Sequence, residues 1–198
     1  MMLKVGITGG IGSGKTTVCQ IFASLGIPIY YADERAKWLM SHDPDLVRAI
    51  KDLFGNQAYS ENGQLNRSHL SKIIFTEPEK REQMNALVHP AVWKDGEQWN
   101  AVQKEVPYTL KEAALIFESG GHRQLDKIIV VTAPEDLRIA RVVERDQVDA
   151  EAVRARIAAQ LPESEKVALA DFVIINDGQH LLIPQVLTIH RELIAELP

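Results

Sequence analysis

Short, mostly apolar runs alternate with longer amphipathic stretches along this chain. The apolar runs are partly β-branched, and they cover Leu3–Thr8, Ile27–Tyr31, Ala113–Phe117, Lys127–Thr132 and Phe172–Ile175. Continuous apolar runs of this length are typical of strands that are buried on both faces of a sheet. Helical patterns between such strands favour a parallel sheet that is built from crossover units. The pattern therefore predicts an α/β fold with a five-stranded parallel sheet.

The interval between the second and third runs is too long for a single crossover and carries three amphipathic helical patterns. Asp43 and Pro44 supply an N-cap followed by proline at the first helical position, and Gly55 ends the same helix. Pro90 is expected to break or kink the third pattern, because proline has no amide hydrogen. We interpret residues 33–106 as a helical insertion beside the sheet.

Two further helical patterns follow the fourth apolar run, at Pro134–Arg145 and Asp149–Gln160, and they are rich in arginine. A local concentration of arginine in an otherwise acidic chain is typical of a segment that meets an anion. A last amphipathic pattern, from about Leu181 to Leu197, predicts a terminal helix that packs on the sheet.

The composition narrows the class of protein. The 198-residue chain has 22 Lys and Arg against 27 Asp and Glu, a net charge of −5, which argues against a nucleic-acid partner. No apolar run approaches the roughly 20 residues that cross a bilayer, and no signal peptide is evident. The single cysteine, Cys19, cannot form an internal disulfide, as is usual in a reducing cytosol. We expect a cytoplasmic protein without a membrane partner, with Cys19 buried in a helix.

A glycine-rich segment supplies the first candidate chemistry. Residues 9–16, Gly-Gly-Ile-Gly-Ser-Gly-Lys-Thr, match the phosphate-loop pattern G-x-x-x-x-G-K-[ST] between a buried strand and an amphipathic helix. The glycines let backbone amides approach phosphate oxygens, Lys15 supplies a charge to the β- and γ-phosphates, and the Thr16 hydroxyl can bind Mg²⁺. The pattern predicts a site for a purine nucleoside triphosphate, with the ligand-binding residues Ile11, Gly12, Ser13, Gly14, Lys15, Thr16 and Thr17.

Several protein classes share such a loop, and the remaining residues favour a kinase. The chain has no guanine-reading N-K-x-D motif, and no strand ends in the Asp-Glu pair of a motor ATPase; Glu118 is the nearest approach. Asp33 follows the second apolar run and so lies at the carboxyl end of a predicted strand, where ligands bind in open α/β folds. There it could accept the proton of an attacking hydroxyl, or cap the next helix, or do both. A nucleotide-dependent binding protein is the non-enzyme alternative.

The whole chain resembles the dephospho-CoA kinase family, in order along its length. The residues that carry the resemblance are Gly6–Lys15, Leu25–Ile27, Ala32-Asp33, Gly63–Arg67, His89-Pro90, Leu115–Glu118, Arg141 and Arg145, Ala159-Gln160, Ala170-Asp171 and Asn176–Gly178. Two positions depart from the family pattern: Tyr31 stands where the family often has aspartate, and Ala114 where it usually has proline.

The resemblance implies a P-loop NTPase-type three-layer α/β/α fold and transfer of the γ-phosphoryl group of ATP to the ribose 3′-hydroxyl of dephospho-CoA, with Mg²⁺. It implies a nucleotide-binding core of residues 1–32, 107–133 and 170–198, an acceptor-binding insertion of residues 33–106 and a lid of residues 134–169. Another P-loop kinase, acting on a small metabolite or nucleoside monophosphate, is the alternative enzyme. The protein is expected to be a monomer or a weak homo-oligomer.

The resemblance also implies roles for single residues. Asp33, Lys15 and Arg141 would be catalytic, with Asp33 as the general base, and Arg145 would close over the phosphates with Arg141. Asn176 and Gly178 would lie near the adenine, and the acceptor side would be formed by Thr8, Asp33, Arg67, His89 and Glu118. Without the resemblance, each of these residues has a simpler interpretation. Arg141 and Arg145 would be solvated arginines, His89 a polar residue at a helix end, and Glu118 a solvated carboxylate.

Overall fold

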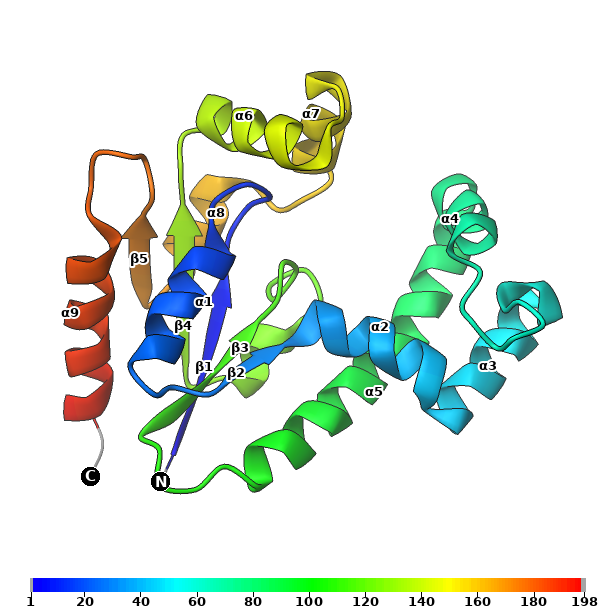
Figure 1. The fold of residues 1–198 in the computed structure, drawn as a ribbon, viewed down its shortest axis with the longest axis horizontal. Coiled ribbons are helices and arrows are strands. Elements are labelled where there is room, and N and C mark those ends of the chain that lie inside the picture. The colour runs from blue at the N-terminus through cyan, green and yellow to red at the C-terminus, as the bar shows by residue number, and fades with distance from the viewer. Residues whose placement is uncertain (1, 197–198) are drawn as a thin grey trace. The chain divides into compact units, whose positions relative to one another are not determined.

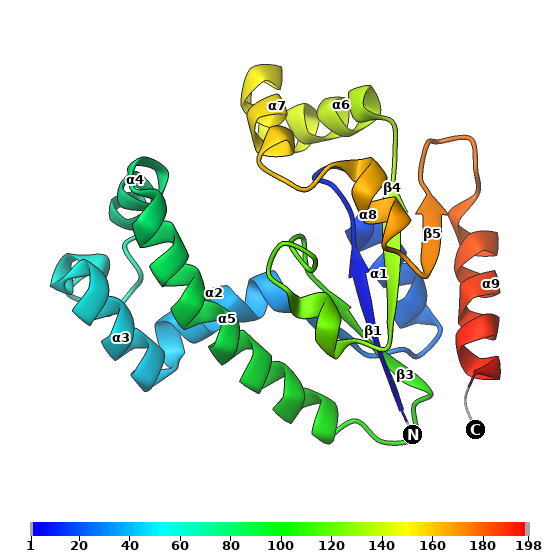
Figure 2. The same cartoon turned by 180° about the vertical axis from the view of Figure 1, so that it is seen from behind.

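The computed structural model describes residues 2–196, apart from the side chain of Phe75. The chain divides into two compact units. The first consists of the residues up to Tyr31 and from Gln103 onward, and the second of Ala32–Val102 (Figures 1 and 2). Each unit has its own set of elements and its own buried residues.

The first unit is built on a five-stranded parallel sheet with the order β2-β3-β1-β4-β5. Its strands are β1 (Leu3–Thr8), β2 (Ile29–Tyr31), β3 (Tyr108–Glu112), β4 (Lys127–Thr132) and β5 (Phe172–Ile175). In the register, Ile7 of β1 lies opposite Glu112 of β3 and Ile129 of β4. The predicted five-stranded parallel sheet is therefore confirmed, and β1 lies at its centre.

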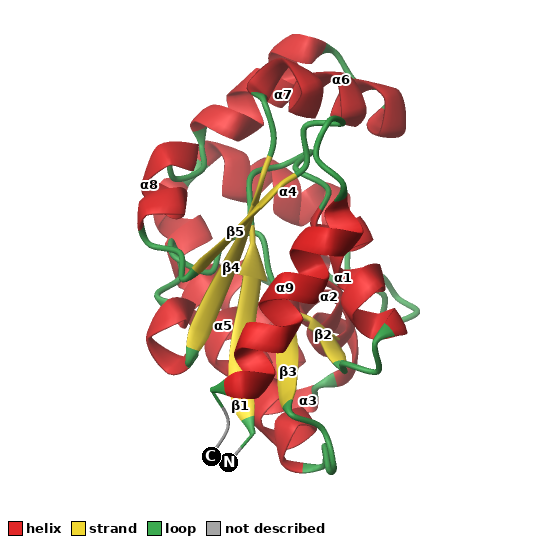
Figure 3. Cartoon of the chain, turned by 90° about the vertical axis from the view of Figure 1, so that its left-hand side faces the viewer, coloured by secondary structure: helices red, strands yellow, loops and turns green. Residues whose placement is uncertain are grey.

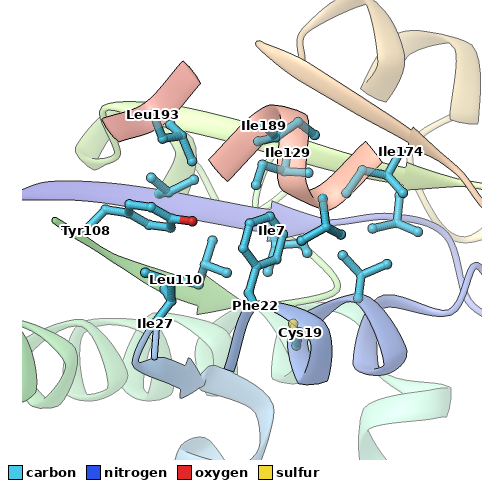
Figure 4. Close-up of a cluster of buried hydrophobic side chains, with 14 residues drawn as sticks. Ile7, Cys19, Phe22, Ile27, Tyr108, Leu110, Ile129, Ile174, Ile189 and Leu193 are labelled. Atoms are coloured by element: carbon cyan, nitrogen blue, oxygen red, sulfur yellow. The ribbon is translucent and has the colours of Figure 1, made fainter. Parts of the chain in front are cut away.

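The faces of this sheet are covered by α1 (Lys15–Ser24), α8 (Glu163–Ala168) and α9 (Leu182–Ala195). Two further helices, α6 (Glu135–Asp146) and α7 (Ala150–Ala158), lie beyond the carboxyl ends of the strands (Figures 1 and 2). In Figure 3, α8 lies on one side of the strands and α1 and α9 on the other. Successive residues of a strand point to opposite faces. Ile129 and Val131 accordingly join the cluster with α1 and α9 (Figure 4), whereas Ile128 and Val130 join the cluster that includes Val167 of α8.

The expected position of the third strand is wrong. The apolar run at Ala113–Phe117 is not a strand but a turn, and β3 is the preceding segment Tyr108–Glu112. Ile116 and Phe117 are apolar because they pack over the sheet, with Ile128 and Val130 of β4. The strand itself was hidden because three of its five residues are polar.

The second unit contains helices only, apart from one isolated bridge between Tyr59 and Leu65. They are α2 (Ala32–His42), α3 (Pro44–Phe54), a short 3₁₀ turn (Asn56–Ala58), α4 (Arg67–Thr76) and α5 (Pro78–Ala101). The side chain of Asp43 accepts hydrogen bonds from the amides of Asp45 and Leu46, so the predicted N-cap of α3 is confirmed. Arg35 of α2 forms two hydrogen bonds, 2.9 and 2.6 Å long, with Asp95 of α5.

Several helix boundaries differ from expectation. Helix α5 runs through Pro90 for 24 residues, so the proline does not break it; Pro90 is exposed, where water can bind the carbonyl that loses its partner. Helix α2 begins at Ala32, directly after β2, so Asp33 lies inside the first turn and is not its N-cap. The short helix α8 was not expected, and the predicted terminal residue Leu197 lies outside the described residues.

None of the helices within residues 2–196 combines the length and the apolar character that crossing a bilayer requires.

Candidate phosphate-binding site

The glycine-rich loop joins the carboxyl end of β1 to the amino end of α1, at the centre of the sheet. Its backbone is tightly enclosed. At Gly9 a Cβ would collide with the carbonyl oxygen of Val131, and at Gly12, with φ of +78°, it would collide with that of Arg138. Both neighbours are backbone atoms that cannot turn away. The loop therefore needs glycine for close approach as well as for its dihedral angles.

Gly12→Ala tests this enclosure. We expect alanine to shift the loop, to lower the melting temperature by several degrees and to weaken ATP binding, because φ near +78° is unfavourable for alanine and its Cβ meets the Arg138 carbonyl. Thermal unfolding and calorimetric ATP titration measure the two effects. Gly55→Ala is the control: Gly55 also has positive φ, +80°, but a Cβ there meets nothing within 4 Å. Equal ATP affinity in the two variants would contradict the inference that close packing around Gly12 maintains the shape of the loop.

Lys15 lies folded against the loop at the start of α1. Its Nζ donates a hydrogen bond to the carbonyl of Gly9 at 3.1 Å, and the amide of Ser13 donates to the carbonyl of Gly10 at 3.1 Å. The partial positive charge of a helix amino terminus also favours an anion at this place. The ammonium, the helix end and the loop amides together form a cradle for phosphate groups.

Glu112 is a candidate residue that the sequence analysis missed. It ends β3, next to β1, and its Oε1 lies 4.0 Å from Nζ of Lys15. Both side chains are only 12% exposed, so water screens the attraction between the ammonium and the carboxylate less than it would at the surface. An acid at the end of a strand could have identified Glu112 from the sequence. The third strand, however, was expected to begin five residues later along the chain, so Glu112 was not recognised as a strand end. Residues 2–196 contain no group of three His, Cys, Asp or Glu side chains that could hold a metal ion.

Arg141 and Asn176, which were both predicted as site residues, contact the outer side of the loop. The guanidinium of Arg141 donates to the carbonyl of Gly12 at 3.4 Å and to that of Asn176 at 3.0 Å. Nδ2 of Asn176 donates to the carbonyl of Ser13 at 2.8 Å. Helix α6 and the end of β5 are thus joined to the loop through its carbonyl groups, which leaves amides for an anion.

Arg145 and Gly178 belong to two separate local features, a pair of hydrogen bonds between neighbouring residues and a turn. Arg145, although one turn from Arg141 on α6, forms two hydrogen bonds with the neighbouring Asp146, at 2.7 and 3.1 Å. Gly178, with φ of +84°, lies in the turn after β5. Hydrogen bonds from the amides of His180 and Gln179, and from the His180 ring, lower the pKa of Asp177 in this turn to about 2.

The residues expected on the acceptor side fall in both units. In the first unit, Thr8 is buried and donates to the carbonyl of Ala114 at 3.2 Å. Glu118 accepts a hydrogen bond from the amide of Leu161 and forms an ion pair with Lys166. Asp33, Arg67 and His89 belong to the second unit, where they lie on α2, α4 and α5 and are exposed.

Cys19 is fully buried on α1, as predicted. Burial, with a smaller effect of the Glu112 charge and an opposing one of Lys15, raises the pKa of its thiol to about 12. At pH 8 only about one thiol in ten thousand is then ionised, and the thiolate is the reactive form. We expect a maleimide or disulfide reagent to label the folded protein very slowly and the urea-unfolded protein fast. Equal rates in the two states would contradict this burial.

Comparison with known proteins gives one family. The family model for dephospho-CoA kinase, CoaE, matches residues 3–181. The dephospho-CoA kinase of Porphyromonas gingivalis is 43% identical over 189 residues, which is 95% of this chain and 93% of the relative. That of Bacteroides fragilis is 39% identical over 197 residues, or 100% of this chain and 94% of the relative.

Solved structures show the same likeness. The crystal structure of TT1252 from Thermus thermophilus gives a TM-score of 0.85 at 32% identity and covers 100% of this chain and 98% of that one. Dephospho-CoA kinase from Campylobacter jejuni gives 0.72 at 28% identity over 98% of each chain. A shikimate kinase from Acinetobacter baumannii, with a TM-score of 0.51 and 14% identity, shares the fold alone; it covers 100% of this chain and 97% of that one.

Proposed function

The chain belongs to the dephospho-CoA kinase family, and we propose that it transfers the γ-phosphoryl group of ATP to the ribose 3′-hydroxyl of dephospho-CoA. The observation that carries this proposal on the donor side is the enclosed loop between β1 and α1, with the Lys15 ammonium folded against it. Such a loop binds the phosphates through backbone amides, and its lysine stabilises the charge that develops on the leaving diphosphate.

Asp33 is the proposed general base. It lies in the first turn of α2, directly after β2, and the carboxyl ends of parallel strands are where ligands bind in open α/β sheets. Its carboxylate would accept the proton of the 3′-hydroxyl as the oxygen attacks the γ-phosphorus in line. Thr8, Arg67 and His89 are proposed to bind the rest of the acceptor.

Two residues next to the phosphate loop carry oxygen atoms that suit a divalent cation. Thr16 offers a hydroxyl at the start of α1, and Glu112 offers a carboxylate at the carboxyl end of the neighbouring β3. Oxygen ligands of this kind suit Mg²⁺, which usually takes few protein groups and completes its shell with water and phosphate oxygens. We propose that these two residues hold Mg²⁺, which would neutralise part of the charge on the β- and γ-phosphates.

Arg141 is proposed to stabilise the transferring phosphoryl group, since its guanidinium already reaches the loop carbonyl of Gly12. Arg145 would join it only after leaving Asp146, which now holds it through two hydrogen bonds. Asn176 and Gly178 are proposed to line the adenine site, because Asn176 contacts the loop at Ser13.

An acceptor panel tests the proposed function. We expect ADP formation from ATP to be fast with dephospho-CoA and close to background with adenosine monophosphate, shikimate or no acceptor, because an in-line transfer needs a positioned hydroxyl. A coupled assay for ADP measures all four conditions. Fast ADP release without an acceptor would indicate an ATPase, and a preference for another acceptor would contradict the proposed substrate.

A further inference from the structure

The outer side of the phosphate loop is fastened to the helical segment that follows β4. The amide of Ile11 donates a hydrogen bond to Oε1 of Gln160 at 3.0 Å. The Ile11 side chain also packs against a buried cluster, which consists of Ile139, Val142 and Val153 of α6 and α7. Ile11 is therefore held through both its backbone and its side chain by residues far along the chain.

The residue after Gln160 is held by a second hydrogen bond to a distant part of the chain. The amide of the next residue, Leu161, donates to Oε1 of Glu118 at 2.9 Å, and the amide of Gln160 itself donates to the carbonyl of Ile157 at 3.0 Å. Glu118 lies in the turn region after β3. This carboxylate thus ties the segment after β3 to the residue that follows Gln160.

A buried charge keeps Glu118 in place. Its Oε1 lies 3.4 Å from Nζ of Lys166 on α8, and the Lys166 side chain is 0% exposed. Among the described residues, this ammonium makes no hydrogen bond, so the charge of Glu118 is its compensation. If Glu118 turned toward water, it would leave an unpaired charge in the interior, which is strongly unfavourable. The ion pair therefore fixes the carboxylate that holds Leu161.

We propose that Gln160 is a positioning residue of the phosphate loop and that Glu118, held by Lys166, acts on the same loop through it. The inference rests on the proposed ATP site. Loop amides bind phosphate well only when they are already held in the binding geometry, because ordering them on binding would reduce the affinity. Loss of the Gln160 side-chain carbonyl would remove the hydrogen bond that holds the Ile11 amide. The loop would then be less well ordered before binding, and the affinity for ATP would fall.

This role for Glu118 differs from direct contact with the acceptor, and kinetics separate the two. A residue that touches dephospho-CoA changes the KM for dephospho-CoA, whereas a residue that shapes the phosphate loop changes the affinity for ATP.

The first test replaces Gln160 with leucine. We expect the Kd for ATP, measured by calorimetry without acceptor, to rise about fivefold to tenfold, the factor for one hydrogen bond. The KM for dephospho-CoA should stay within about twofold of wild type, and the melting temperature should fall by no more than a few degrees, since one hydrogen bond of a half-buried, uncharged side chain is lost. Gln20→Leu, at an exposed position on α1, is the matched control. An unchanged Kd for ATP in Gln160→Leu overturns the proposal.

The second test compares two double variants that both lack the buried ion pair, so neither has an unpaired interior charge. Glu118→Ala with Lys166→Met removes the acceptor of the Leu161 amide, and Glu118→Gln with Lys166→Met keeps a carbonyl there. We expect the Kd for ATP to rise severalfold in the first and to return toward wild type in the second. Equal ATP affinities, or a change confined to the KM for dephospho-CoA, would overturn the role of Glu118. Because ATP binding is measured alone, this result stands apart from whether dephospho-CoA is the acceptor.

Discussion

Replacing Lys15 with alanine will lower the turnover number about 100-fold to 1,000-fold, the usual effect of removing one donor that stabilises developing charge. The Lys15 ammonium lies against the loop, 3.1 Å from the Gly9 carbonyl, and it is the cation of the phosphate-loop motif. Steady-state kinetics with ATP and dephospho-CoA measure the loss. We expect the fold to persist, because Lys15 is not part of the apolar core of the unit.

Two further variants make the effect of Lys15 specific. Lys15→Met keeps most of the side-chain volume and should lose as much activity as Lys15→Ala, since the charge is what acts on the phosphates. Lys104→Ala removes an exposed lysine from the same unit and should retain wild-type kinetics. Normal turnover in Lys15→Met would show that the ammonium has no part in the transfer.

Asp33→Asn will retain ATP affinity but lose at least about 100-fold in turnover, the scale of general-base assistance. Asparagine keeps the shape of the side chain in the first turn of α2 and removes the group that accepts the proton. Calorimetry gives the Kd for ATP, and initial rates at saturating substrates give the turnover number. Glu34→Gln, the neighbouring exposed acid on α2, should leave both quantities near wild type. If Asp33→Asn turned over as fast as wild type, another group would have to accept the proton.

The sequence predicts the elements around the phosphate loop well because local patterns determine them. Strands β1, β4 and β5 are apolar runs between turns, and their bounds agree with expectation. The loop motif identifies its own place between a strand and a helix. These features depend on neighbouring residues along the chain, so no knowledge of distant contacts is needed.

Strand β3 shows where local pattern fails. Lys111 and Glu112 make its second half polar because these residues reach toward particular partners, the Tyr30 ring at 5.7 Å and the Lys15 ammonium at 4.0 Å. The apolar run that follows covers the sheet instead of joining it. Hydropathy alone assigned the strand to the wrong residues and therefore hid Glu112.

Contacts between distant segments were also beyond the sequence pattern. Nothing in the residues near Gln160 indicates that its carbonyl receives the amide of Ile11, or that Glu118 is paired with the fully buried Lys166. Each of these contacts joins segments that only the folded chain brings together. The family resemblance likewise implied one shared role for Arg141 and Arg145, yet Arg141 contacts Gly12 and Arg145 contacts Asp146.

The fate of the γ-phosphoryl group tests the central claim most directly. The protein is incubated with γ-labelled ATP, with and without dephospho-CoA, and the labelled products are identified by phosphorus NMR and mass spectrometry. The account predicts that the label moves to the ribose 3′-hydroxyl of dephospho-CoA, that ADP forms in equal amount, and that little label is released when the acceptor is absent. Label that appears as inorganic phosphate at the same rate with and without dephospho-CoA would contradict it.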